Sequence, residues 1–194
     1  DLGKREAILE ASRLIRAIVK KQEESVLSGE DSGDDPHDGI YVLSGTNDQA
    51  NLDATPTLAT MATFISNTIA DVESLYDPSD AVIVMHPLKV ALLMGSTVGA
   101  SELTGALSWG SPRDGIPPTI FGYRLIAHPE SKISTTYWAS CFHPSNVVFA
   151  ESGPIAIDIN PWLYWTSNTS AMRAMTHFDF TCGIANQISK ADHT

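Results

Sequence analysis

The strongest structural signal in the chain lies in residues 4–28, KREAILEASRLIRAIVKKQEESVLS. Apolar residues recur there at steps of three and four, and no Gly or Pro interrupts them, which predicts one long amphipathic helix. About 25 residues at ~1.5 Å each span roughly 37 Å, with Gly29 as the stop. A rod of this length needs a partner along its side, either in its own core or also on neighbouring subunits. The apolar stripe consists of Ala7, Ile8, Ala11, Leu14, Ile15, Ile18 and Val19.

A polar loop follows this helix. The stretch Glu30–Asp38 places five carboxylates around Gly33 and Pro36, a composition typical of a solvated turn. An EF-hand reading from Asp31 fails, because Gly33 stands where an oxygen ligand is needed and Pro36 stands where Gly is needed. No metal site is therefore predicted here. The next five residues, 39–43, are expected to form a short extended segment that ends at Ser44-Gly45.

The middle of the chain predicts a mixed α+β layer. Thr55-Pro56 is a good helix entry, and a helix is expected over about 57–76. The run Ala81–Met85 is continuously apolar and β-rich, which predicts a strand covered on both faces. His86-Pro87 then opens a short helix expected over 88–94.

The C-terminal half is predicted to be rich in sheet. The Gly- and Pro-rich residues 95–118 indicate little regular structure beyond a turn of helix at 101–107. Residues 172–182 alternate apolar and polar, which predicts a long strand with one buried face, about 35 Å in length. Shorter strands are expected at 119–127, 137–142, 146–150 and 155–159.

Composition excludes several classes of protein. The chain has 194 residues, a formal net charge of −11 and 43% hydrophobic residues, which describes a soluble globular protein without membrane spans. Lys and Arg are absent from Gln22 to Leu88, where thirteen acids lie, so contact with DNA is expected to be loose. The two cysteines, Cys141 and Cys182, are expected to be buried thiols of a cytoplasmic protein. Because Asp1 stands in place of an initiator Met, the N-terminus is expected to be a cut end.

No residue set predicts catalysis, a cofactor or a metal. The sequence has no GxGxxG, GxxxxGK[ST], GxSxG or HExxH motif. Three histidines precede proline, at positions 86, 128 and 143, and are expected to end strands or begin turns, because the residue before Pro avoids the helical region. His177 shares a strand face with Asp179, and a structural ion pair is expected there rather than catalysis.

The segment Pro161–Trp165 concentrates two of the four tryptophans in five residues. Aromatic side chains bury large areas in cores and at interfaces alike. A core plug at a sheet corner and a contact between subunits both remain open for this segment.

The order of these segments resembles the major capsid proteins of tailed phages, the Hong Kong ninety-seven type of shell fold. The resemblance runs from a long helix ending in ESVLSG at 24–29, through Pro36 and Gly39-Ile40, to the Thr-Pro helix and AVIVMHP at 81–87. It continues with the Gly-rich stretch, with IFGYRLI at 120–126, which resembles the family's strand pair, and with a closing long strand at 172–184. The match covers nearly all 194 residues and rests on order and spacing.

The resemblance implies an α+β fold with two parts. A peripheral domain would combine residues 1–54, with the spine helix, and residues 164–194, with the returning long strand. An axial domain would occupy residues 55–163, with Gly-rich loops around the five-fold and six-fold axes. The N-terminal arm and the extended hairpin loop of the family have no counterpart in this sequence, and no lysine-bearing loop matches the family's Lys-to-Asn crosslink.

The implied function is structural. Copies of the chain would assemble into pentamers, hexamers and an icosahedral shell around double-stranded DNA, a virion component built in the host cytoplasm. Portal, scaffold or decoration proteins are further implied partners, and no enzyme activity, cofactor or membrane is implied. An encapsulin-type nanocompartment has the same fold and remains an alternative. The alternative from a different class is a small acidic hydrolase with His86 or His128 near Asp114.

Overall fold

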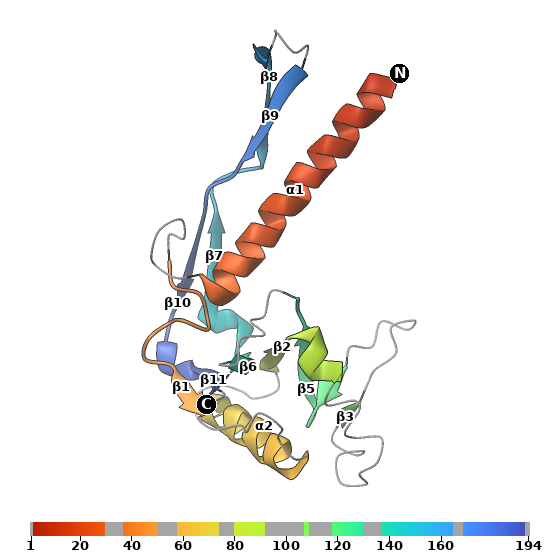
Figure 1. Ribbon diagram of the computed structural model, residues 1–194. Coiled ribbons are helices and arrows are strands. Elements are labelled where there is room, and N and C mark those ends of the chain that lie inside the picture. Colours follow the sequence, from red (N-terminus) through yellow and green to blue (C-terminus); the bar gives the residue numbers. More distant parts are fainter. Residues whose placement is uncertain are drawn as a thin grey trace.

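The computed structural model describes residues 2–29, 37–49, 58–73, 80–91, 107–108, 118–129, 137–164 and 169–192. A mixed sheet forms the body of the protein, and a long helix and a β-ribbon project from it side by side (Figure 1). The N-terminus lies at the far tip of the helix, whereas the C-terminus lies beside the sheet. The molecule is therefore elongated, and the outer parts of α1 and of the ribbon extend well beyond the sheet.

Helix α1 (Leu2–Ser28) confirms the predicted long helix. It ends where Gly29 N–H still bonds to the Ser25 carbonyl at 2.9 Å. A Cβ on Gly29 would lie 2.5 Å from that same carbonyl oxygen, so the chain can leave the helix this tightly only through glycine.

The expected extended segment at 39–43 is wrong, because these residues form a turn under the end of α1. The N–H groups of Ile40 and Tyr41 donate to the carbonyls of Val26 and Leu27, each at 2.9 Å, and so satisfy carbonyls in the last turn of the helix. Both side chains are fully buried. The apolar run that resembled a strand is therefore a cap that packs against the sheet.

The sheet has seven strands in the order β1-β11-β6-β2-β5-β4-β3 among the described residues. The pairs β1–β11 and β2–β5 are parallel, and the other neighbours are antiparallel. The sheet strands are β1 (Asn47–Gln49), β2 (Val82–Met85), β3 (Leu107–Ser108), β4 (Thr119–Ile120), β5 (Tyr123–Ala127), β6 (Tyr137–Phe142) and β11 (Ile188–Asp192).

Strand β2 is buried on both faces, as its continuously apolar sequence predicted. One face, with Ile83 and Met85, belongs to a core cluster that includes Ile69 and Val72 of helix α2 (Leu58–Glu73). The other face, with Val82 and Val84, packs in a second cluster. That second cluster also contains Leu27, Ile40, Tyr41, Phe142, Phe180 and Ile188, and so joins α1, the capping turn and the ribbon to the sheet.

The ribbon consists of two successive antiparallel strand pairs. Strand β7 (Val147–Glu151) pairs with β10 (Phe178–Cys182), and farther out β8 (Ala156–Tyr164) pairs with β9 (Thr169–Met175). The predicted single strand at 172–182 is therefore interrupted at 176–177, where Ser152 N–H donates to the His177 carbonyl at 2.9 Å. Its alternation is confirmed, since the even-numbered residues are less exposed than the odd-numbered ones along its length.

Two short 3₁₀ turns hold the base of the ribbon to the sheet, η3 (Pro144–Asn146) and η5 (Ala185–Gln187). Buried Asn146 links the two corners: its amide donates to the Ile184 carbonyl and its amide oxygen accepts from Ile184 N–H, both at 2.8 Å. On β11, the buried Lys190 ammonium donates to the carbonyls of Tyr41 and Leu43 at 3.1 Å each. These contacts fix the direction in which the ribbon and α1 leave the sheet.

Other predicted elements shift at their ends. The short helix after His86 is described over residues 87–91, and the predicted strand at 119–127 is divided by a tight turn into β4 and β5. Strand 137–142 agrees with its prediction. Residue 146 belongs to η3 instead of a strand, and β8 extends past the predicted 155–159. The predicted helical turn at 101–107 lies almost wholly outside the described residues, although Leu107 begins β3.

Candidate assembly surface

Helix α1 has one face packed against the protein and an apolar ridge left in solvent. Its least exposed side chains lie in a line on successive turns, and they become more buried toward the C-terminal end of the helix: Ala11, Leu14, Ile18, Gln22 and Ser25. Helix α1 also contacts β9. Three apolar side chains beside that line, Ile8, Ile15 and Val19, stay exposed, and Ile8 retains 68% of its accessible surface. We call these three residues the α1 ridge. Their spacing of seven and four residues places them along one stripe of the helix.

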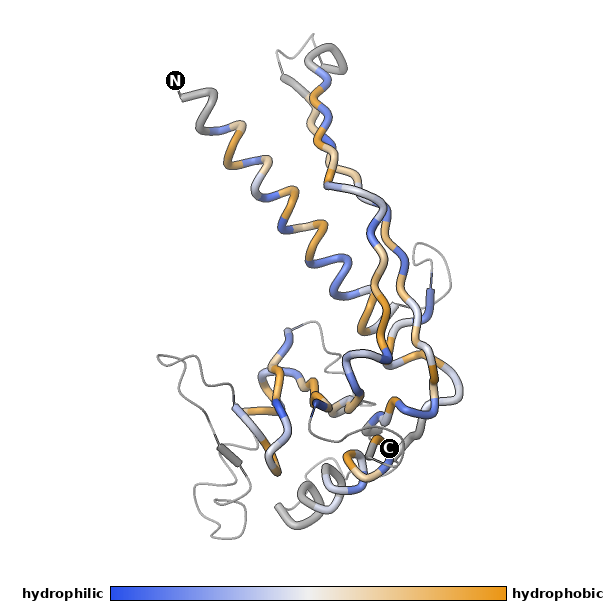
Figure 2. Tube along the Cα trace, turned by 180° about the vertical axis from the view of Figure 1, so that it is seen from behind, coloured by the Kyte–Doolittle hydropathy of each residue, from blue (hydrophilic) through white to orange (hydrophobic). Residues whose placement is uncertain are grey.

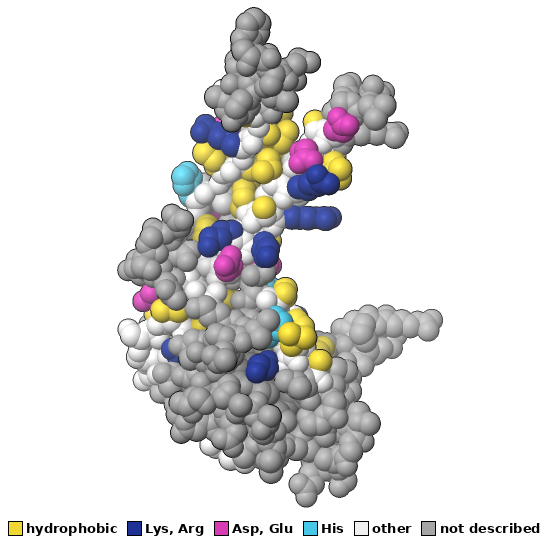
Figure 3. Space-filling model, viewed as in Figure 1, with side chains coloured by type: hydrophobic (Ala, Val, Ile, Leu, Met, Phe, Trp, Pro, Cys, Tyr) yellow, Lys and Arg dark blue, Asp and Glu magenta, His cyan; other side chains and the backbone are white. Residues whose placement is uncertain are grey.

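The ribbon also carries exposed apolar residues. Ile157 and Ile159 of β8 pair with Ala174 and Met172 of β9, and residues directly opposite in an antiparallel pair share a face. Ile159 is 58% exposed and Ile157 is 36% exposed. Hydropathy colouring shows apolar segments along both α1 and the ribbon (Figure 2). In the space-filling view, hydrophobic side chains gather along the facing parts of these two projections (Figure 3).

The outer part of the ribbon is only two strands wide. Among the described residues β8 and β9 pair with each other and with no third strand. A two-stranded hairpin is marginal in water, and unpaired edges invite another chain. An outer ribbon of this kind gains stability when a neighbouring surface covers it.

The base of α1 is anchored to the ribbon by His37. Its Nε2 lies 3.2 Å from Ser25 Oγ, and its ring lies 5.6 Å from that of Phe178 and 5.4 Å from that of Phe180. Phe178 in turn stacks on Phe149 at 5.5 Å. The helix and the ribbon are thus fixed to each other at the base, and both leave their outer halves exposed.

Charges on the projecting part are held loosely. Arg13 pairs with Glu10 at 2.6 Å, and Arg173 pairs with Asp158 at 3.0 Å across β8 and β9. All four side chains are more than half exposed, so these ion pairs add little to stability. A contact made by this surface would therefore be stabilised mainly by burial of its apolar side chains.

The three His-Pro histidines end strands or begin turns, as predicted. His86 follows β2, and its Nδ1 accepts the Leu88 N–H at 3.1 Å. His143 caps η3 by accepting the Ser145 N–H. His128 follows β5, and its Nε2 lies 3.4 Å from a Glu23 carboxylate oxygen of α1. The hydrolase reading needed Asp114 near one of these rings, and Asp114 lies outside the described residues.

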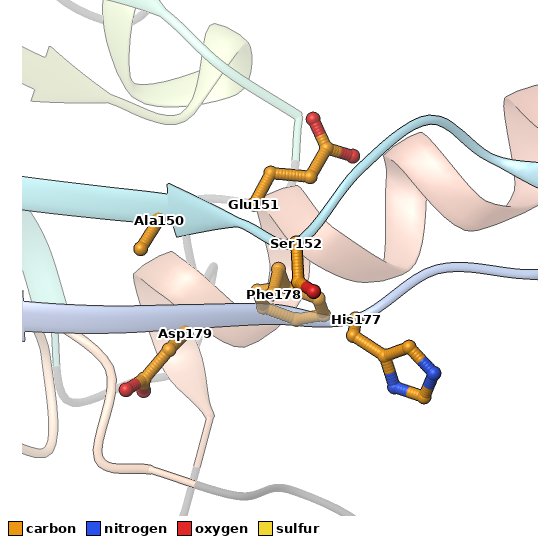
Figure 4. Close-up of a pocket in the computed structure, with 6 residues that line it drawn as sticks. All are labelled: Ala150, Glu151, Ser152, His177, Phe178 and Asp179. Atoms are coloured by element: carbon orange, nitrogen blue, oxygen red, sulfur yellow. The ribbon is translucent and has the colours of Figure 1, made fainter.

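His177 lies at the ribbon kink beside a shallow pocket of about 290 Å³. The predicted ion pair with Asp179 is wrong: in Figure 4 the His177 imidazole and the Asp179 carboxylate point to different places along the strand, and Asp179 Oδ1 instead accepts the Phe180 N–H at 2.8 Å. Ser152 contributes its N–H to the His177 carbonyl, and Glu151 accepts a hydrogen bond from Thr176 Oγ1. None of the described contacts here joins a nucleophile to a base.

Residues 161–164 of the aromatic segment fall at the distal end of the ribbon, and Trp165 lies outside the described residues. Residues 161–164 belong to β8, and Tyr164 pairs with Thr169 beside the connection to β9. Its position far from both core clusters is compatible with the intersubunit alternative; both alternatives for its side chains remain predictions. The acidic loop lies outside the described residues except for His37 and Asp38.

The thiols lie in different surroundings. Cys141 is fully buried in the sheet core, whereas Cys182 is partly buried, and desolvation raises its pKa to about 11. A thiol with that pKa stays protonated at neutral pH and is a poor nucleophile. Within the described ranges, no three His, Cys, Asp or Glu side chains are grouped to hold a metal ion. None of the helices in those ranges has the length and apolar character needed to cross a membrane.

Comparison with known proteins gives a structural match and no sequence match. No protein-family model and no curated protein matches the chain. Among solved structures, it is similar to the capsid of the native GTA particle, computed with C5 symmetry, with a TM-score of 0.71, 14% identity, and 97% of this chain and 65% of that chain covered.

Two further solved structures give the same picture. The capsid of the empty GTA particle matches with a TM-score of 0.69 and 14% identity over 97% of this chain and 66% of that chain. A structure of Mycobacterium phage Bobi matches with a TM-score of 0.66 and 12% identity over 96% of this chain and 65% of that one. The chain spans slightly less than two thirds of these longer chains, and it has the fold found in phage capsid structures.

Proposed function

We propose that this chain is a structural subunit that assembles with copies of itself into a phage shell around double-stranded DNA. One observation supports this most: the chain has the fold of capsid subunits over nearly its whole length. The exposed α1 ridge and the outer ribbon support it physically. A subunit that leaves apolar side chains of two long projections in solvent gains stability when neighbouring copies cover them.

The contacts of this proposal are heterologous. Head-to-tail contacts close into pentameric and hexameric rings, and the rings share edges in the shell. Each interface can be of ordinary size, because a subunit inside a lattice leaves only by breaking several contacts at once. The division into segments 1–54, 55–163 and 164–194 belongs to this proposal. The central segment then supplies β7 and β8, with which the returning segment pairs.

Charge fits a container for DNA. A net charge of −11, with no Lys or Arg between Gln22 and Leu88, disfavours tight binding to phosphate. If the acidic surface lines the lumen, packaged DNA is held loosely and can leave. The site of action is then the virion, assembled in the host cytoplasm, with portal, scaffold and decoration proteins as further partners.

The test is to produce the complete protein, including any flanking sequence its gene encodes, and to observe it by negative-stain electron microscopy and light scattering. Closed particles of uniform size are expected. A protein that stays monomeric at all concentrations contradicts the proposal. If such a monomer turns over ester or amide substrates, the hydrolase alternative replaces it.

Particle contents separate the phage shell from an encapsulin. Particles from phage-producing cells are treated with nuclease and then opened. Protected double-stranded DNA of defined length is expected. Particles that hold a single cargo enzyme and no protected DNA indicate the nanocompartment instead.

A further inference from the structure

One backbone position has a conformation that its residue type rarely adopts. Strands β4 and β5 are joined by the two-residue turn Phe121-Gly122, with Ile120 paired to Tyr123. Phe121 has φ 51° and Gly122 has φ 88°. Two successive positive φ values are typical of a type I′ hairpin turn, whose first position favours Asn, Asp or Gly. A bulky aromatic residue is strained there.

Phe121 is the sole residue other than glycine with positive φ in the described part of the chain. Its side chain is only partly covered, because it keeps 39% of its surface exposed while neighbouring Ile120 is fully buried. The turn itself is well held, since Leu125 N–H donates to the Pro118 carbonyl at 2.9 Å across its base. A partly exposed aromatic side chain thus stands at a well-held hairpin tip.

The strand register places this tip at one defined end of the sheet. Strand β2 runs parallel to β5, and β6 runs antiparallel to β2, so the start of β2 and the end of β6 lie at the same end as the turn. Asp80 and His143 are therefore at that end, together with Arg124. They contribute to a pocket of about 430 Å³ beside the turn. This end of the sheet therefore has a projecting hairpin tip, the Phe121-Gly122 turn, next to a pocket.

We propose that Phe121 is an anchor residue in a contact with a second copy of this chain. This inference rests on the proposed function, because a shell subunit meets identical neighbours on several sides. Aromatic residues on rigid supports dominate interfaces, since they bury a large area and lose little conformational freedom. In a head-to-tail contact each copy inserts its own tip and receives that of its neighbour. The strain in the free subunit is then tolerated because the ring is useful only in the assembly.

Substitution separates the backbone from the ring. F121N creates the favoured Asn-Gly turn and removes the aromatic side chain, so it relaxes the strain while it deletes the contact. We expect its dissociated subunit to melt about 2–4 °C higher than wild type, as relief of a strained φ predicts. We expect the concentration needed for half-maximal assembly to rise about tenfold or more, as for loss of an interface anchor. A merely structural role would move both measurements in the same direction.

F121W is the matched control, because it keeps both an aromatic ring and the strained backbone. It is expected to assemble at a concentration much closer to wild type than F121N does. An F121N variant that assembles like wild type overturns the proposal. So does an F121W variant that assembles as poorly as F121N.

Photocrosslinking identifies the partner directly. Benzoylphenylalanine at position 121 of the full protein is irradiated in assembled and in dissociated samples. A covalent dimer of this chain is expected in the assembled sample and not in the dissociated one. Crosslinks that reach another virion protein and never a second copy overturn the proposal.

The experiments distinguish failure of the shell proposal from failure of the Phe121 anchor proposal. Wild-type protein that forms rings and no closed shell removes the shell proposal, and the F121N measurement on ring formation still decides the role of Phe121. Closed wild-type shells together with an inert F121N variant remove only the anchor. A wild type that remains monomeric overturns both.

Discussion

At the scale of single residues, the junction between α1 and its capping turn depends on two glycines that touch. Gly39 N–H donates to the Gly29 carbonyl at 2.8 Å. A Cβ on Gly39 would lie 2.6 Å from Gly29 N and 2.7 Å from Ser25 O, which are backbone atoms that cannot rotate away. The end of the long helix can therefore pack this closely on the capping turn only because Gly39 has no Cβ atom.

Gly39→Ala is expected to lower the free energy of unfolding by about 3 kcal/mol, because overpacking against backbone forces the helix end to move. Chemical denaturation with circular dichroism measures this. Gly153→Ala is the matched control: its φ of 107° makes alanine strained, but nothing lies within 4 Å. That control is expected to cost about 1 kcal/mol. Equal losses in the two variants would contradict the steric explanation.

Asn146→Ala is the second prediction at this scale. It removes both hydrogen bonds between the buried Asn146 amide and the backbone of Ile184, which hold the two corners together. A loss of about 2–4 kcal/mol in the free energy of unfolding is expected. Asn146→Asp keeps the acceptor oxygen and loses the donor, so it serves as the partial control. An alanine variant within 0.5 kcal/mol of wild type would show that water replaces the amide.

At the scale of elements, the projecting helix is held at its base and exposed at its outer half. The base is fixed by His37, by the capping turn and by the second core cluster, which contains Leu27. The α1 ridge farther out lies beside the line that faces β9, and its side chains keep between 38% and 68% of their surface exposed. Stability of the folded chain and capacity for assembly therefore depend on different parts of one helix.

The double variant Ile8→Glu and Ile15→Glu tests this separation. It is expected to change the free energy of unfolding of the dissociated subunit by less than about 1 kcal/mol, since exposed positions contribute little. Assembly, followed by light scattering, is expected to fall at least tenfold, because burial of charged side chains against a neighbour is costly. The matched control, Leu9→Glu and Ala17→Glu, adds the same two charges at exposed positions of α1 outside the ridge stripe. Unchanged assembly of the ridge variant would exclude α1 from the interface.

At the scale of the whole molecule, an elongated subunit whose two projections carry exposed apolar side chains is expected to have a stability that depends on concentration. Ligand linkage applies when the ligand is another copy, so each tenfold increase above the dissociation constant adds about 1.4 kcal/mol to the folded state. For a chain of this size the melting temperature is expected to rise about 3–6 °C per decade.

Differential scanning calorimetry over three decades of protein concentration, with sedimentation velocity on the same samples, measures this dependence. The F121N protein at its monomeric concentrations gives the baseline. A melting temperature that stays constant while the sedimentation coefficient reports assembly would show that association adds nothing to folding. A constant value with a monomer throughout would contradict the shell proposal.

Local pattern was sufficient for the elements whose signal lies within one segment. The uninterrupted three- and four-residue spacing predicted α1, the apolar run predicted a doubly covered β2, and alternation predicted the exposure pattern of 172–182. The preference of the residue before Pro also predicted that the His-Pro pairs end strands or begin turns. Each of these depends on periodicity or on the φ preference of neighbouring residues, which a sequence displays directly.

Only the tertiary structure decided the rest, because its causes lie between distant segments. Asn47–Gln49 and Ile188–Asp192 lack a strong strand signal and become β1 and β11 because β11 pairs with β6 on one side and with β1 on the other. Ile40 and Tyr41 have the sequence pattern of a strand, yet they form a cap because their N–H groups donate to carbonyls in the last turn of α1. The positive φ at Phe121 follows from the two-residue link between β4 and β5. Hydrogen bonds to a remote partner outweigh local preference wherever that preference is worth only a few tenths of a kcal/mol.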